Sequence, residues 1–127
     1  GTNVKVKGSN STYVDGTTTQ NLISGVVKVW YSVDMYDNTN NIEGSFNLSS
    51  ITDNSTGSNF ANYINNMSDQ NYTPAGMSTD RNIMSTANAS TEGNSSRQTN
   101  LFKGRVGTHA GAVQDAYHYN QIVGDLA

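Results

Sequence analysis

The sequence contains no cysteine and one proline, and only 13% of its 127 residues are charged. The absence of cysteine excludes disulfides, thiolate zinc sites, iron–sulfur clusters and cysteine nucleophiles. Apolar runs are short, so the sequence predicts neither a membrane-spanning segment nor a signal-peptide core. The formal net charge is −3 and there is no basic stripe, which argues against binding to nucleic-acid phosphates.

Small polar residues dominate what is present, with 18 Asn, 15 Ser, 14 Thr and 12 Gly. Low hydrophobicity of this kind is partly a signature of disorder. Eleven aromatic residues, ten valines and the clustering of the apolar residues favour a folded chain instead. The length predicts a single domain that spans residues 1–127.

Residues 26–51 carry the strongest local pattern, which is that of a central β-hairpin. Between Val27 and Met35 every second residue is apolar, as expected of a strand with one buried face. Residues rich in Asn follow, and a second strand then places Ile42, Phe46 and Leu48 on one side. We expect the following side chains to be almost fully buried: Val29, Tyr31, Val33, Phe46 and Leu48.

Weaker strands are predicted at residues 3–7, 11–14, 20–24 and 100–106, and extended structure at 117–123 after alanines that fit a helix up to Ala116. The β pattern disappears in a long polar excursion over residues 52–99. One short helix is predicted there at 58–67, from the spacing of Phe60, Ile64 and Met67, and a second short turn near 80–87. The predicted fold is mainly β, a single antiparallel β-sandwich or jelly-roll-like domain.

Signals for catalysis are weak throughout the sequence. The two histidines, His109 and His118, are nine residues apart, and a structural or surface role is favoured over a metal or catalytic one. No Gly-x-Ser-x-Gly elbow or phosphate-binding glycine loop is present, and Glu43 and Glu92 are the only glutamates. The sequence therefore predicts a protein that is not an enzyme, with a hydrolase as the third-ranked class.

The predicted hairpin turn gathers oxygen ligands of the kind that calcium prefers. The metal candidates are Asp34, Asp37 and Asn41, with Asn38, Asn40 and Glu43 nearby. The spacing is not that of an EF-hand, and strand alternation points Asp34 and Asp37 to opposite sides. A plain turn without a cofactor is favoured, and calcium is the alternative.

The polar face of the first predicted strand also allows a sugar-binding interpretation, because flat aromatic rings lie beside polar side chains there. The candidate ligand-binding residues are Trp30, Asp34, Tyr36, Asn38 and Asn40. Burial of the single tryptophan in the core is the favoured alternative.

Seven Asn-x-Ser/Thr sequons occur, a small excess over what the composition alone would give. They make the chain compatible with a glycoprotein of the surface. The candidate glycosylation sites are Asn10, Asn47, Asn54, Asn66, Asn71, Asn88 and Asn94.

Low charge, abundant small polar residues and β patterning are typical of subunits that pack against copies of themselves or face the exterior. We therefore expect a non-enzymatic structural subunit or adhesin in an extracellular filament, on a cell surface or in a virion. Copies of itself are the expected partners. Val4 and Val6 in residues 1–8 form a possible edge or donor strand for self-assembly. The runner-up is a carbohydrate-binding (lectin-like) module that uses the 34–41 turn with Trp30 and Tyr36. Its partners would be glycans, and its binding could depend on calcium.

Overall fold

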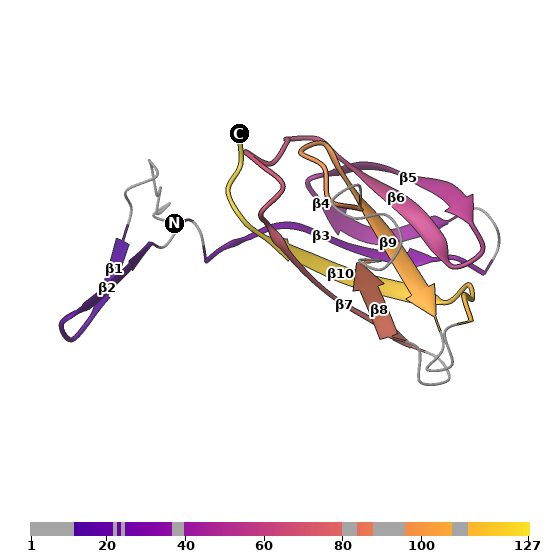
Figure 1. Ribbon diagram of the computed structural model, residues 1–127, viewed down its shortest axis with the longest axis horizontal. Helices are drawn as coiled ribbons and strands as arrows, with labels where there is room; N and C mark the ends of the chain where they lie inside the picture. The colour runs from indigo at the N-terminus through magenta and orange to yellow at the C-terminus, as the bar shows by residue number, and fades with distance from the viewer. Residues whose placement is uncertain are drawn as a thin grey trace, which may run out of the picture.

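A computed structural model describes residues 12–21, 23, 25–36, 40–79, 84–87, 96–107 and 112–127. Strands dominate these residues, and all paired strands are antiparallel. A short hairpin of β1 (Thr12–Asp15) and β2 (Thr18–Asn21) turns at Gly16, whose φ of 61° suits a residue without a side chain. In Figure 1 this hairpin stands apart from the remaining strands.

Those remaining strands form two four-stranded sheets. The β3 sheet has the order β4-β3-β10-β7 and consists of β3 (Val27–Asp34), β4 (Asn41–Phe46), β7 (Thr73–Thr79) and β10 (Tyr117–Val123). The β6 sheet has the order β5-β6-β9-β8 and consists of β5 (Leu48–Ser55), β6 (Ser58–Tyr63), β8 (Met84–Ala87) and β9 (Leu101–Gly107). The prediction of a mainly β chain with antiparallel sheets is confirmed.

The hydrophobic core contains side chains from both sheets. Val29 and Val33 of β3 are fully buried, as are Phe102 and Val106 of β9. The predicted alternation in the first hairpin strand is therefore confirmed, since Tyr31 and Met35 also lie in this core. In the opposite set of β3 residues, Trp30 is exposed and Ser32 and Asp34 are partly exposed, whereas Lys28 is buried.

The second strand of the predicted hairpin is interrupted at Asn47, where φ is 57° and the chain passes from the β3 sheet to the β6 sheet. Asn47 accepts a hydrogen bond from Asn65 N at 2.7 Å and donates one to Asn65 O, which fixes the bend. The break separates Phe46, which is 55% exposed, from Leu48, which is 8% exposed. The prediction that Phe46 is buried is wrong, because Phe46 pairs with outward-facing Trp30, and Ile42 is partly exposed as well.

The helix predicted at 58–67 is also wrong, because residues 58–63 form β6 and the described residues contain no α-helix. The inward-facing positions of β6 are Asn59, Ala61 and Tyr63, all buried. An alternation that includes asparagine and alanine carries little hydrophobic signal, whereas Phe60 on the outer side completed an apparent helical spacing.

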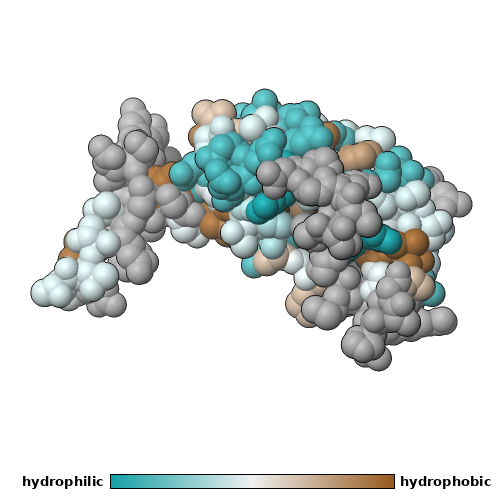
Figure 2. Space-filling model, viewed as in Figure 1, coloured by the Kyte–Doolittle hydropathy of each residue, from teal (hydrophilic) through white to brown (hydrophobic). Residues whose placement is uncertain are grey.

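The described residues of the polar excursion predicted at 52–99 contain part of β5 and all of β6, β7 and β8, so the β structure does not end at residue 51. Three of these strands, β5, β7 and β8, lie at the edges of their sheets. Edge strands bury less surface than central strands, so their sequences remain polar. Figure 2 shows mostly teal and white surface over β5 and β6.

The other strand predictions had mixed outcomes. Those at 11–14, 100–106 and 117–123 are confirmed by β1, β9 and β10. The prediction at 20–24 overlaps β2 only at residues 20 and 21, and residues 112–116 are not helical. Residues 3–7 lie outside the described part of the chain. In the described part, no helix is long or apolar enough to cross a membrane.

Candidate functional site

The outer face of the β3 sheet carries an aligned set of large side chains. Antiparallel pairing places Gln121 of β10 opposite Trp30, and Tyr119 opposite both Ser32 and Met77. Residues that face each other across neighbouring strands project on the same side. β3, β10 and β7 therefore present aromatic, thioether, amide and hydroxyl groups together to solvent.

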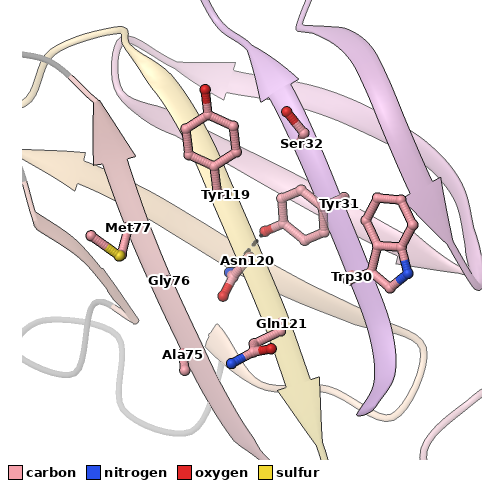
Figure 3. Close-up of a pocket in the computed structure, with 9 residues that line it drawn as sticks. All are labelled: Trp30, Tyr31, Ser32, Ala75, Gly76, Met77, Tyr119, Asn120 and Gln121. Carbon is pink, nitrogen blue, oxygen red and sulfur yellow. Dashed lines mark hydrogen bonds between the residues drawn. The ribbon is translucent and has the colours of Figure 1, made fainter.

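A groove of about 570 Å³ runs over these three strands. Trp30 on β3 and Met77 on β7 stand on its two sides, and Tyr119 and Gln121 project from β10 between them (Figure 3). None of the lining residues carries a charge at neutral pH. The lining residues are Trp30, Tyr31, Ser32, Ala75, Gly76, Met77, Tyr119, Asn120 and Gln121.

Trp30 is 44% exposed, so the interpretation that buried the single tryptophan in the core is wrong. The inner side of β3 is already occupied by Val29, Tyr31 and Val33, which leaves the outer side to Trp30. Its indole lies over Gly44 of β4, where a Cβ atom would approach Trp30 Cζ3 to 3.3 Å. The absence of a side chain at Gly44 lets the ring lie across the neighbouring strand.

Beneath the groove, Asn120 Nδ2 donates a hydrogen bond to Tyr31 Oη at 3.0 Å, and both residues are buried. Burial is the main cause that raises the pKa of Tyr31, so its hydroxyl stays neutral over the physiological range. The Tyr31 ring meets His118 edge to face, with centroids 5.6 Å apart. Buried, packed side chains therefore lie directly beneath the groove.

Two carboxylates lie beside the groove on the β3–β4 side. Ser32 Oγ donates a hydrogen bond to Glu43 Oε2 at 2.7 Å, and Asp34 follows two residues later on the same side of β3. Asp34 is the main cause that raises the pKa of its cross-strand partner Tyr117, and Glu43 adds to the same effect. This part of the outer face therefore has a negative potential.

Of the four predicted ligand-binding residues that the structure describes, only Trp30 lines the groove. Tyr36 is exposed and packs edge to face on Tyr117, while Asp34 Oδ1 accepts a hydrogen bond from Tyr36 N. Asn40 is buried and accepts a hydrogen bond from Asn59 at the core. Asn38 lies outside the described residues.

The groove residues that sequence reasoning missed include Ser32, Met77, Tyr119 and Gln121, which share the outer face with Trp30. The strand predicted at 117–123 placed Tyr119 and Gln121 on one side, but its sequence did not show that this side faces outward and that Asn120 and Ile122 are the buried residues. Met77 carried no strand signal, because its edge strand lacks a regular alternation of apolar residues.

Of the metal candidates, the structure describes Asp34 and Asn41, and the described residues include no cluster of three or more His, Asp or Glu side chains suited to a metal ion. Asn41 lies in β4 and is exposed, and Asp37 falls outside the described residues. The calcium alternative stays a prediction.

The two histidines have different outcomes. His118 is fully buried on the inner side of β10, so it reaches neither the solvent nor the groove. Its ring packs against Gly104, where a Cβ would come within 2.5 Å of His118 Cε1. A structural role fits this position, and His109 lies outside the described residues.

The sequons divide by their surroundings. Asn54, Asn66 and Asn71 are exposed, whereas Asn47 is buried and its amide is engaged with Asn65. None of these four lines the groove. The other three, Asn10, Asn88 and Asn94, lie outside the described residues.

Comparisons with known proteins gave no match to a family, to a curated protein or to a solved structure.

Proposed function

We propose that this chain is a non-enzymatic adhesive β-sandwich module that binds glycans in the groove over β3, β10 and β7, on an extracellular filament, a cell surface or a virion. The observation that carries the proposal is the exposure of Trp30, Tyr119 and Met77 around one groove. Exposed apolar patches rimmed by polar groups mark interaction sites, and burial is otherwise favoured for such side chains.

The chemistry of the lining favours a sugar as the ligand. A pyranose ring has an apolar C–H face, which can stack on Trp30 or Tyr119, and a rim of hydroxyls. The Gln121 amide can both donate and accept hydrogen bonds, and Ser32 Oγ can accept one while it donates to Glu43. Mostly apolar walls with a few polar groups are typical of small-ligand sites.

The test is the binding of the purified domain to an array of immobilised oligosaccharides, followed by titration of the best ligand. We expect Trp30→Ala to lower the affinity by at least about tenfold, because the stacking surface is lost. Phe60→Ala is the matched control, since Phe60 lies on the outer side of the β6 sheet. Its affinity should equal that of the wild type, and both variants should keep the wild-type unfolding midpoint within a few degrees.

Retention of full glycan affinity by Trp30→Ala would reject the groove as the site. A change of oligomeric state in Trp30→Ala, without any glycan bound by the wild type, would assign the same face to contacts between copies instead.

Self-assembly is the second candidate function, and the open edges of both sheets favour it. β4 and β7 end the β3 sheet, while β5 and β8 end the β6 sheet, so each of these four is the last strand of its sheet in the part of the chain that the structure describes. An unpaired edge can accept a strand from another copy. Val4 and Val6 remain the proposed donor residues.

A further inference from the structure

We infer that the groove selects neutral oligosaccharides, and that Asp34 and Glu43 at its β3–β4 side act as specificity residues that disfavour acidic sugars such as uronic, sialic or sulfated ones. This inference rests on the proposed function, because it names the ligand class of the same site.

The position of the carboxylates is the first observation. Ser32 lines the groove, and its hydroxyl reaches Glu43 Oε2 at 2.7 Å, so one negative charge lies a single hydrogen bond from the lining. Asp34 lies on the same side of β3, opposite Tyr117 and next to the row that contains Tyr119. A ligand held against Tyr119 and Ser32 would have both charges as neighbours.

The electrostatic effect of these two carboxylates on the neighbouring strand β10 is the second observation. The Asp34 carboxylate, and to a lesser extent Glu43, disfavour the ionised form of Tyr117 on the next strand. A ligand carboxylate or sulfate at this side of the groove would meet the same repulsion. The effect is that of like charges over a few ångströms at a partly exposed surface, which salt screens.

The placement of the described cations is the third observation. Lys28 belongs to the same strand, but its amino group donates to the carbonyls of Ile23 and Val26 and the residue is 6% exposed. Lys103 and Arg105 lie on β9 of the other sheet, and Arg97 donates to Tyr72 O. Among the described residues, no cation therefore lines the groove to pair with an anionic sugar.

The experiment compares neutral and acidic glycans of related backbone on one array, for example lactose with sialyl-lactose and galactan fragments with galacturonate oligomers. The variants are Asp34→Asn, Glu43→Gln and the double variant. Each replacement keeps an oxygen acceptor, for Tyr36 N in the first and for Ser32 Oγ in the second, so the local fold is conserved. Asp53→Asn on β5 of the β6 sheet is the matched control for charge.

We expect the wild type to retain neutral members and to bind their acidic counterparts more weakly. Each single variant should raise the affinity for acidic members by about threefold to tenfold at low ionic strength. Neutral members should bind each variant as they bind the wild type, and the gain should shrink at high salt. Asp53→Asn should leave both classes unchanged.

Equal binding of both classes by the wild type, or equal changes for both classes in the variants, would overturn the inference while the groove remains a glycan site. Trp30→Ala is tested in parallel on the neutral glycans. If this variant loses their binding, the groove is a glycan site whether or not the inference about charge selectivity holds. If no glycan is retained at all, the proposed function fails and this inference fails with it.

Discussion

At the residue scale, the buried His118 makes the stability of the folded domain depend on pH. Burial lowers the pKa of His118 to about 4, so the imidazole is neutral in the folded domain at neutral pH. In the unfolded chain the group takes up a proton below about 6.5. The stability that comes from keeping His118 neutral is complete above that pH and is lost as the pH falls from about 6.5 towards 4.

We predict that the free energy of unfolding falls by about 2 kcal/mol between pH 7.5 and pH 5 because of this residue. Denaturant unfolding of the wild type and of His118→Leu at several pH values measures the effect. The leucine variant should lack most of the slope between pH 6.5 and 5, where few carboxylates titrate. Parallel curves for the two proteins would show that His118 is not the cause.

At the scale of the element, the change of sheet at Asn47 makes neighbouring side chains differ in their contribution to stability. Leu48→Ala should cost about 2 to 5 kcal/mol because it leaves a cavity in the core. Phe46→Ala removes a side chain that is more than half exposed, and should cost less than about 1 kcal/mol. Chemical denaturation of both variants tests the crossover. A larger loss for Phe46→Ala would instead place residues 42–48 in one continuous strand.

The central elements of the fold were predictable because their alternation is strong. β3 buries Val29, Tyr31 and Val33 at every second position, and β10 follows two tyrosines with an isoleucine and a valine. The break at Asn47 was not predictable, since a left-handed conformation at an asparagine leaves the apolar spacing of Ile42, Phe46 and Leu48 unchanged. Strand β6 was also missed, because its buried positions include Ser58, Asn59 and Ala61, which carry little hydrophobic signal.

The candidate site was predictable only at Trp30. Its other walls come from β10 and β7, which are distant in sequence and meet β3 through strand pairing. Neither the order β3-β10-β7 nor the outward side of Tyr119 follows from local patterns alone. Once the register is known, the alignment of Trp30, Tyr119 and Met77 follows from the alternation of side chains along each strand.

At the scale of the whole molecule, the sheet edges at β4, β7, β5 and β8 and the polar composition favour assembly through strand addition. We predict that the full chain forms polymers and that deletion of residues 1–8 yields a soluble, less stable monomer. Light scattering and electron microscopy would measure the assembly state. The double variant with Val4→Asp and Val6→Asp should behave like the deletion, because charged side chains cannot fill an apolar groove. Assembly unchanged by either alteration would exclude a donor strand from these residues.

The groove over β3, β10 and β7 is open along the outer face, so a bound sugar would keep much of its surface in water. One domain that covers a ligand on one side only can hold it with modest affinity and release it quickly. Display of many copies on one surface changes this, because each further contact forms at a high effective concentration once the first has formed. Attachment by such an array would be firm yet reversible under dilution by free sugar, and its strength would depend on the spacing of the copies more than on any single contact.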